Sequence, residues 1–487
     1  MNATPAQQVP FPEDDRDLSP EERLELLCDP GSVHVIRSSV RSRRLGNKAF
    51  AGDGVIGMSG SVNGRPIFCY AQDEQVVGGS LGEAHANTIL RVMNLASMAR
   101  APVVGFIASA GARMQEGTAA LSGYARIFRE TVSLSGRVPQ ISVVTGVSAG
   151  GGCYSPALTD FTVMTRRARM FLTGPKVVRE VLGEDVTAEE LGSDRVHSRN
   201  GVSHFVADDD SDAIRLVREL LSYLPQNAWE PPPRAAAHVA PGEPSRYVPT
   251  SSRKVYDVRD VAAAIADGGR LLEVAPQWAR NIVIAFARID GRSIGIVANQ
   301  PRYFGGIIDV HAAQKAARFV RTCNAFGIPL VVLVDTPGFM PGTRQEIEGL
   351  IRHGAKLVHA FAEATVPKLT VVLRKAYGGA YIAMNSKDLG AHYVYAWPSA
   401  EIGIMGPQQA ISIIHRRRLA AASDPEALKR RLAAEYRQEH VHAGAAASDG
   451  FVDEIIAPEE TRSRLTGALA ALEHQLGPVG GCGLVPL

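Results

Sequence analysis

Two glycine pairs, Gly150-Gly151 and Gly378-Gly379, are the residues best placed to do chemistry, because each follows a run of β-branched residues. The second pair is followed by Ala380. Small residues at the end of a strand let backbone N–H groups approach a carbonyl oxygen that becomes an oxyanion. Losing one such donor typically raises the barrier by about 3 to 4 kcal/mol. A single Gly-Gly is more often a turn, but its recurrence favours two oxyanion sites.

A second pair of loops has the sequences SAGARMQEG, at 109–117, and DTPGFMPGT, at 335–343. Both follow apolar runs and both precede helical patterns. In α/β folds ligands bind at the edge of the sheet where such loops gather. We therefore expect these loops to lie beside the glycine pairs.

The sequence shows no recognisable motif for a side-chain nucleophile or for nucleotide binding. Ser148 and Ser155 lie near the first glycine pair, but no GxSxG elbow accompanies them. The sequence has no GxxxxGK[ST] loop, no GxGxxG that opens a strand–helix unit, and no cysteine pair at zinc spacing. A site with two anion holes and no side-chain nucleophile is typical of enolate chemistry on thioesters.

The elements that must hold these loops alternate between buried strands and amphipathic helices. Continuous apolar runs, typical of strands covered on both faces, occur at 102–109, 141–146, 161–165, 294–299, 329–335 and 368–374. Residues 86–100 and 314–326 show helical spacing. The alternation predicts α/β layers with crossover helices.

The two halves of the chain repeat one another. At an offset of 227 or 228 residues, matches of Gly, Arg or Pro recur in order over about ninety residues, as expected of a duplicated domain. The matches are Gly64-Arg65 with Gly291-Arg292, Gly78-Gly79 with Gly305-Gly306, Arg91 with Arg318, Pro102 with Pro329, Gly111 with Gly338, Val138-Pro139 with Val366-Pro367, and the two glycine pairs.

Length and composition agree with two domains. A chain of 487 residues exceeds what one core usually supports. Residues 225–253 are rich in Pro, Ala and Ser without an apolar period, which is typical of a linker. We predict an N-terminal domain at 1–224, a linker at 225–253 and a C-terminal domain at 254–487.

Charge and hydropathy restrict the partners and the location. Lys plus Arg (52) nearly balances Asp plus Glu (50), so no broad field favours nucleic acid or a membrane surface. No window approaches 18 apolar residues, and the first residues are polar and acidic. We expect a cytoplasmic protein without a structural metal or disulfide framework.

Ten ordered motifs between about residue 20 and residue 470 resemble the carboxyltransferase (β) subunits of biotin-dependent acyl-CoA carboxylases, the propionyl-CoA carboxylase type in particular. The motifs are SLGEAH, AGARMQEG, SPALTDF, VANQP, KAARFVR, DTPGFMPGT, RHGAK, ATVPK, RKAYGGAY and YAWPSAE.

The resemblance implies two tandem crotonase-like domains of the ClpP/crotonase superfamily. It also implies that acyl-CoA is held mainly by the N-terminal domain and biotin by the C-terminal domain of a partner subunit. The active site would then lie at a dimer interface within a homohexamer, a trimer of dimers.

The residue roles are also implied by the resemblance, position by position. The catalytic residues would be Gly150 and Gly151, which hold the thioester oxygen, and Gly379 and Ala380, which hold the ureido oxygen of biotin. The substrate-binding residues would be Ser109, Ala110, Gly111, Ala112, Arg113, Tyr154 and Ile382. The biotin-binding residues would be Pro337, Gly338, Phe339, Gly378 and Tyr381.

The cofactor would be biotin, presented as carboxybiotin on a separate carrier protein. The sequence has no EAMKM-like biotinylation site and no ATP-grasp signature. Biotin carboxylase and carrier functions are therefore expected on another (α) subunit, and no metal or nucleotide is expected on this chain.

Three departures from the family pattern bear on the site. Ala110 stands where relatives commonly have Gly, and residues 146–154 read GVSAGGGCY where GPCAGGAVY is usual. Ile382 stands where propionyl-selective relatives often have Asp. An apolar residue there predicts acceptance of acetyl, propionyl and butyryl groups, unless Ile382 is simply a packed residue.

Two other functions remain open on the sequence. A biotin-dependent decarboxylase subunit uses the same site in reverse with a membrane partner, and a catalytically silent paralogue would only assemble with or regulate a true carboxylase. The sequence also leaves open the native acyl group, the carrier, the oligomer size, and whether the acceptor is a CoA or a carrier-protein thioester.

Overall fold

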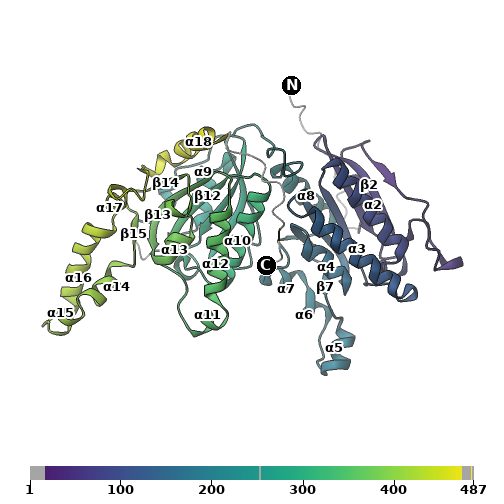
Figure 1. The fold of residues 1–487 in the computed structure, drawn as a ribbon, viewed down its shortest axis with the longest axis horizontal. Helices are drawn as coiled ribbons and strands as arrows, with labels where there is room; N and C mark the ends of the chain where they lie inside the picture. Colours follow the sequence, from purple (N-terminus) through teal and green to yellow (C-terminus); the bar gives the residue numbers. More distant parts are fainter. Residues whose placement is uncertain (1–16, 252–253, 474–483, 485–487) are drawn as a thin grey trace. The chain divides into compact units, whose positions relative to one another are not determined.

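The apolar runs of the sequence form the central strands of two mixed sheets (Figure 1). The computed structural model describes residues 17–251, 254–473 and Leu484. These residues divide into two compact units between Pro232 and Pro233, and Ala275–Trp278 belongs to the first unit. The division falls inside the Pro-rich segment 225–253.

The first described helix of the first unit is capped, because Ser19 and Glu22 form a capping box. Its helices are α1 Pro20–Leu27, α2 Glu83–Ala99, α3 Thr118–Leu134, α4 Gly151–Leu158, α5 Pro175–Leu182, α6 Ala188–Gly192, α7 Asp194–Asn200 and α8 Asp210–Tyr223. Its strands are β1 His34–Ile36, β2 Val55–Val62, β3 Arg65–Gln72, β4 Val103–Ser109, β5 Gln140–Ala149, β6 Phe161–Thr165, β7 Arg169–Phe171 and β8 Phe205–Ala207.

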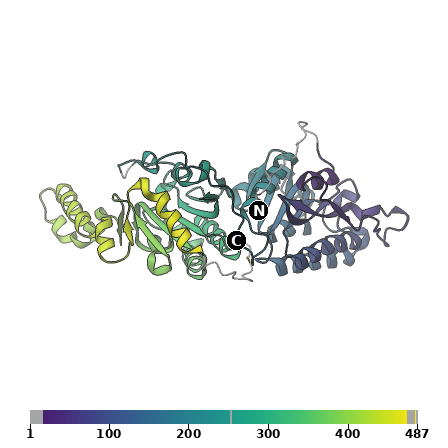
Figure 2. The same cartoon turned by 90° about the horizontal axis from the view of Figure 1, so that it is seen from above.

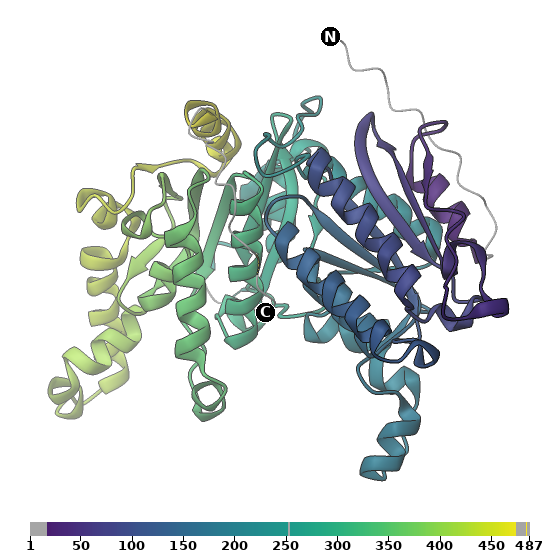
Figure 3. The ribbon, with the colours of Figure 1, turned by 45° about the vertical axis from the view of Figure 1, so that its right-hand side comes forward.

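The first sheet has the strand order β1-β2-β3-β4-β5-β6-β8, and β7 pairs with the end of β5. The strands from β3 to β8 run parallel, so their carboxyl ends lie at one edge. Helices α2 and α3 pack side by side over one face, as Figure 3 shows in blue. Helices α1 and α8 pack together and contact strands of the sheet, and the central strands are buried.

The second unit has helices α9 Val258–Ile265, α10 Val310–Ala325, α11 Thr343–Ile347, α12 Leu350–Glu363, α13 Gly378–Ala383, α14 Pro407–Ile414, α15 Arg416–Ala420, α16 Pro425–Tyr436, α17 Ala443–Ser448 and α18 Thr461–Ala471. Its strands are β9 Leu272–Glu273, β10 Ile282–Ile289, β11 Arg292–Asn299, β12 Leu330–Thr336, β13 Lys368–Tyr377, β14 Tyr393–Ala396, β15 Glu401–Gly403 and β16 Glu454–Ile455.

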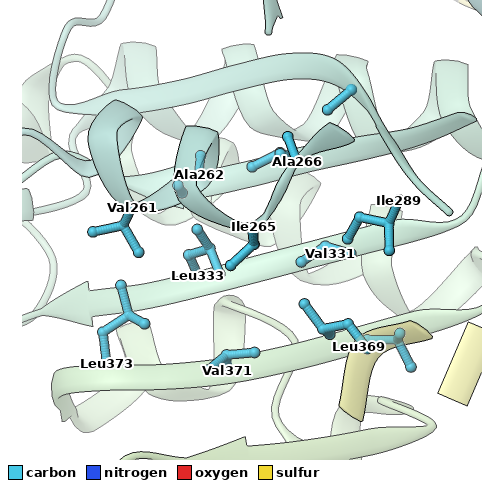
Figure 4. Packing of buried hydrophobic residues seen from close by; sticks show 14 of the residues in the cluster. Val261, Ala262, Ile265, Ala266, Ile289, Val331, Leu333, Leu369, Val371 and Leu373 are labelled. Carbon is cyan, nitrogen blue, oxygen red and sulfur yellow. The ribbon is translucent and has the colours of Figure 1, made fainter. Parts of the chain in front are cut away.

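The core of the second unit lies between its sheet and the helices α9 and α18. Leu333, Val371 and Leu373 point from the strands toward Val261 and Ile265 of α9 (Figure 4). Helix α18, yellow in Figure 2, adds three buried side chains to the same cluster. Helices α10 and α12 pack against each other, and α10 contacts β10 and β11. Buried strands of this kind explain the continuous apolar runs.

The second sheet repeats the first strand for strand. Its order is β9-β10-β11-β12-β13-β14-β16, and β15 pairs with the end of β13. The pairing register shifts between Ile107 and Ser109 in the first sheet and between Val334 and Thr336 in the second, at equivalent positions. The expectation of two tandem crotonase-like domains from an internal duplication is therefore confirmed.

Close backbone packing fixes equivalent glycines in both units. A Cβ at Gly79 would collide with the carbonyl oxygen of Ala108, and a Cβ at Gly306 would collide with that of Asp335. Both glycines have positive φ angles of 65° and 81°. Glycine is required at such positions, which is why these pairs survive as sequence matches.

The units differ after the short strands β7 and β15. Helices α5, α6 and α7 follow β7, whereas the four helices α14 to α17 follow β15. Helix α16 is followed directly by a π-helical turn at Arg437–Val441. Four described cysteines, Cys28, Cys69, Cys153 and Cys323, are buried and free, while Cys482 lies outside the described residues.

Candidate active site

Each glycine pair lies where a buried strand turns into a helix. Gly150 follows β5 and precedes α4 with φ 55°, and Gly378 follows β13 and opens α13 with φ 58°. Side-chain-bearing residues rarely adopt such angles. The first N–H groups of a helix have no acceptor within the helix, so this turn presents donors at the carboxyl edge of the sheet.

The structural register pairs Gly150 with Gly378, because both have the positive φ angle and the same place after the strand. Gly379 and Ala380 then correspond to Gly151 and Gly152. The predicted catalytic pairs, Gly150-Gly151 and Gly379-Ala380, are therefore one residue out of step between the two units.

The loop after β4 lies against the first glycine pair. β4 and β5 are neighbouring parallel strands, and Ser109 pairs with Ser148. A Cβ at Gly111 would lie 3.1 Å from the carbonyl oxygen of Ala149. The predicted residues of 109–112 and the glycine pair are thus brought together in one unit.

Matching turns hold the loops after β4 and β12. The Gly111 N–H donates to Ser109 Oγ at 3.3 Å, and the Gly338 N–H donates to Thr336 Oγ1 at 3.3 Å. Ala112 forms a β-bridge with Leu81, and Phe339 forms the equivalent bridge with Ile308. Gly111 and Gly338 have φ angles of 100° and 145°.

Tyr124 of α3 connects the two loops of the first unit, and sequence reasoning missed it. Its hydroxyl lies 3.2 Å from Ser109 Oγ, and a Cβ at Gly151 would lie 2.8 Å from its ring. Burial raises the pKa of Tyr124 to about 12, so the hydroxyl stays neutral. No motif in the sequence marks this residue.

Phe339 occupies the corresponding space in the second unit. Its ring lies 3.7 Å from the place of a Cβ at Gly379 and 3.3 Å from that of a Cβ at Gly354 of α12. The predicted residues Gly338, Phe339 and Gly379 therefore lie together. Pro337 belongs to the same loop, between Thr336 and Gly338.

Tyr154 and Ile382 occupy equivalent positions on α4 and α13, each four residues after the glycine with positive φ. Tyr154 is 49% exposed and Ile382 is 50% exposed. The Tyr154 ring contacts Phe128 edge to face at 5.9 Å. Ile382 is not a packed core residue, and both side chains can meet a ligand.

Tyr381 and Cys153 are also equivalent to each other. Burial raises the pKa of both groups to about 12. The Cys153 thiol donates to the carbonyl oxygens of Ser148 and Phe171 at 3.0 and 2.9 Å. Cys153 is therefore a neutral thiol that fastens α4 to the end of β5.

Arg113 is enclosed by the protein. Its guanidinium forms ion pairs with Asp53 at 2.7 Å and Glu116 at 3.0 Å, and the three side chains are fully buried. It also donates to the carbonyl oxygen of Ser80 at 2.9 Å. In this arrangement Arg113 fixes the loop rather than presenting its charge at the surface.

The carboxylates around Arg113 have opposite pKa shifts. Burial raises the pKa of Asp53 despite its contact with Arg113. Burial acts in the same direction on Glu116, but hydrogen bonds from the Glu83 N–H, Ser42 and Arg113 hold its pKa below the usual value. Burial also lowers the pKa of His85, which contacts Asp53, to about 3. His85 is therefore neutral at physiological pH.

An ion pair between strands supports the second unit. Arg374 of β13 donates to Asp335 of β12 at 3.0 Å, and its guanidinium stacks over the Tyr256 ring at 5.0 Å. Burial raises the pKa of Asp335. The sequence motifs contained both partners, but neither was predicted to have this role.

Glu401 of β15 ties the residue before Gly378 to the helices that follow. The Tyr377 hydroxyl donates to Glu401, which forms an ion pair with Arg437 at 2.8 Å. Burial raises the pKa of Tyr377. Within the described residues, no group of three or more His, Cys, Asp or Glu could hold a metal ion.

Three basic residues after β6 are paired with carboxylates of the protein itself. Arg166 pairs with Asp208, Arg167 with Asp210 and Arg169 with Glu189. Within the described parts of the chain, no helix is long and apolar enough to cross a membrane.

Comparison with known proteins identifies the family to which this chain belongs. The model of the carboxyl transferase domain matches residues 16–477. A propionyl-CoA carboxylase carboxyltransferase subunit from Haloferax mediterranei is 48% identical over 94% of this chain and 91% of its own. The alpha subunit of a methylmalonyl-CoA decarboxylase from Veillonella parvula is 46% identical, over 93% of this chain and 90% of its own.

A solved structure of transcarboxylase 12S, which describes its hexamer assembly with methylmalonyl-coenzyme A and methylmalonic acid bound, is similar throughout. The TM-score is 0.91 at 47% identity, over 94% of this chain and 90% of that chain. The likeness therefore spans both units of the present chain.

Proposed function

The chain belongs to the carboxyl transferase domain family, and from this premise we propose that it transfers a carboxyl group from carboxybiotin to the α-carbon of a short- or medium-chain acyl-CoA. Its family assigns it biotin-dependent carboxyltransferase activity on acyl-CoA. One observation carries the finer proposal: both units present a positive-φ glycine at the same strand-to-helix turn, Gly150 and Gly378.

The first unit is proposed to hold the acyl-CoA. The N–H groups after Gly150 and those of the loop 110–112 would donate to the thioester oxygen. Negative charge develops on this oxygen when the α-proton leaves. Donors fixed before the reaction stabilise that charge more than water does, because no reorganisation is needed.

The positions of these donors depend on Arg113 and Tyr124. Arg113 holds the loop through Asp53, Glu116 and Ser80, and Tyr124 spans from Ser109 to Gly151. We assign both side chains a positioning role. Ser109 would act by accepting a hydrogen bond from the Gly111 N–H, which fixes the backbone of this loop.

The second unit is proposed to hold the ureido ring system of biotin. Gly379 has no Cβ, and the space that a Cβ would take lies beside the Phe339 ring. A planar group can therefore approach the backbone donors of Gly379 and Ala380 across an apolar wall formed by Phe339. Pro337, Gly338, Gly378 and Tyr381 are proposed to contact biotin on the same side.

When bound, carboxybiotin supplies the carboxyl group and the base that removes the acyl α-proton. The residues of this chain hold the two oxygens that gain charge and keep the reacting groups in register. This division of labour needs positioning and preorganised donors rather than a side-chain acid or base. It agrees with the neutral state of Tyr124, Cys153 and Tyr381.

Ile382 is proposed to contact the acyl chain. It is half-exposed on α13, and an apolar surface there places no charge against an alkyl group. Acetyl-, propionyl- and butyryl-CoA are therefore all proposed substrates. Turnover confined to propionyl-CoA would contradict this assignment.

The partners follow from the same reaction. We propose a separate biotin carboxylase/biotin carrier (α) subunit and a homohexamer built as a trimer of dimers. The hexamer assembly described for transcarboxylase 12S supports the second part. Size-exclusion chromatography with light scattering tests it.

The experiment that tests the function is reconstituted carboxylation. The purified chain is combined with the cognate biotin carboxylase/carrier subunit, ATP and bicarbonate, and acyl-CoAs of increasing length are compared. We expect turnover with several short acyl groups. No turnover with any acyl-CoA, given a carrier shown to be carboxylated, would contradict the proposal and favour a silent paralogue.

The similarity to a methylmalonyl-CoA decarboxylase subunit supports one alternative direction. The same site would then take a carboxyl group from methylmalonyl-CoA and pass it to biotin on a carrier. Release of propionyl-CoA from methylmalonyl-CoA with free biotin, compared with the forward rate, separates the two directions.

A further inference from the structure

The first unit contains a pocket that the proposed reaction does not use. Its volume is about 410 Å³, and it is lined by residues of α7 and β8, by Arg166 after β6, and by 275–277. None of these residues belongs to the glycine loops. Ala275 is fixed there by a hydrogen bond from its N–H to the carbonyl oxygen of His204 at 2.8 Å.

The lining is strongly basic. Arg166, Arg195 and Arg199 face one acidic residue, Asp194. Arg166 already pairs with Asp194 at 3.4 Å and with Asp208 at 2.7 Å. The remaining two arginines lie four residues apart on α7, so they share one side of the helix.

Arg195 and Arg199 have no partner among the described residues, in contrast to the paired Arg166, Arg167 and Arg169. Both side chains are exposed, so their guanidinium groups are free to turn toward a ligand in the pocket. An anion between them would accept several charge-assisted hydrogen bonds.

Ser198 supplies a second, independent indication. It is 9% exposed and lines the pocket between the two arginines on α7. Its hydroxyl has no hydrogen-bond partner in the described parts of the chain. The hydroxyl is open to the pocket, so it can donate to a ligand oxygen there.

The residues between α7 and β8 add further polar atoms to the lining. His204 Nδ1 accepts from the Thr162 N–H at 3.0 Å, so in the neutral ring the proton is on Nε2. Ser203, by contrast, is satisfied, because its hydroxyl donates to the carbonyl oxygen of Phe205 at 2.8 Å. The unsatisfied donors are therefore concentrated on α7.

We propose that this pocket binds a phosphorylated small molecule, whose phosphate lies between Arg195 and Arg199 and accepts from Ser198. Guanidinium groups match phosphate geometry through paired N–H donors. The volume of about 410 Å³ exceeds one phosphate and falls within the usual range of small-molecule sites. The inference does not rest on the proposed carboxyl transfer.

Titration calorimetry with inorganic pyrophosphate at constant chloride concentration tests the proposal. The double variant Arg195→Ala/Arg199→Ala should weaken binding at least about tenfold, because charged hydrogen bonds are lost. Arg129→Ala is the matched control, since Arg129 is exposed on α3, has no partner among the described residues and lies outside the pocket. Ser198→Ala should have a smaller effect in the same direction.

Equal affinity of the double variant and the wild type would overturn the proposal, as would the absence of saturable binding by the wild type. Unchanged urea midpoints show that the variants are folded. Competition by free CoA would identify the phosphates of CoA as the source. Simultaneous binding of CoA and pyrophosphate would identify a separate phosphorylated metabolite.

Discussion

In the first unit the loop before α3 is held by buried charges, whereas in the second unit the equivalent loop is supported by an ion pair between two strands. Arg113 lies between Asp53 and Glu116, but Arg374 reaches across to Asp335. The positions equivalent to Asp335 and Arg374 are Ala108 and Gly146 in the first unit. The backbone of the site was kept after duplication, while the side chains that support it were replaced.

The rings beneath the glycines differ in the same way. Tyr124 of α3 supports Gly151 and is tied to Ser109, while Phe339 lies beside Gly379 and comes from the loop itself. The Tyr124 ring is therefore fixed by a hydrogen bond as well as by packing, whereas the Phe339 ring has packing contacts alone.

The largest expected effect concerns the buried charges. Arg113→Met should lower the free energy of unfolding by about 3 to 5 kcal/mol, because Asp53 and Glu116 would be left without their cation. Arg374→Met should lower the free energy of unfolding by less, since only one carboxylate, Asp335, would lose its cation. Urea unfolding measures both, with Arg129→Met as the exposed control. Equal losses for the two buried arginines would break the distinction between the units.

The glycine turns should matter equally in both units. Gly150→Ala and Gly378→Ala should each slow carboxylation by at least about 100-fold, since a Cβ disfavours the positive φ that aims the donors. Steady-state rates with propionyl-CoA measure this. Gly64→Ala is the control, because Gly64 has φ 74° in a hairpin with open space around it. A large loss in only one unit would contradict the proposal of two matched anion sites.

An intermediate effect should appear on acidification. The folded-state pKa of His85 is lowered to about 3, so its stabilising contribution is present above the unfolded pKa and is lost as pH falls below it. Between pH 7 and pH 5 this group should cost the protein about 2 kcal/mol of unfolding free energy. The equivalent residue in the second unit is Ala312, which cannot titrate.

Urea unfolding at the two pH values tests this, and His85→Gln should remove most of the difference while keeping a hydrogen-bonding side chain. Asp53 works in the opposite direction, because its raised pKa favours the folded state at low pH. An unchanged pH dependence in His85→Gln would show that other groups control acid stability.

The smallest effect should be on acyl selectivity. Ile382→Asp should reduce the kcat/KM of butyryl-CoA relative to propionyl-CoA by about tenfold, within the range available to one contact in an apolar pocket. At the equivalent position, Tyr154→Phe should change both substrates alike. Competition between the two acyl-CoAs measures the ratio. A ratio unaffected by Ile382→Asp would remove this residue from the acyl pocket.

The fold was predictable because its constraints are local and repeated. Gly79 and Gly306 must be glycine where the backbone of the next strand passes, and such residues keep their spacing after duplication. Buried strands gave continuous apolar runs for the same reason in both halves. The resemblance to a known family then identified the two halves as tandem crotonase-like domains.

The supports of the site could not be predicted from spacing. Asp53 and Arg113 are separated by 60 residues, and Asp335 and Arg374 by 39. Nothing in a linear pattern indicates which carboxylate a buried arginine meets. Arg113 was consequently predicted to bind substrate, while its observed contacts are with Asp53, Glu116 and Ser80. Tyr124 likewise looks like any other helix residue in the sequence, because its contact with Gly151 exists only in the folded structure.

The buried cysteine thiols can report local unfolding of each unit separately. Cys28, Cys69 and Cys153 lie in the first unit and Cys323 lies in the second, all free and enclosed. In a Cys482→Ser variant, an alkylating reagent can reach these four thiols only when the surrounding packing loosens. The order in which the thiols are labelled during heating therefore shows which copy of the duplicated domain unfolds first.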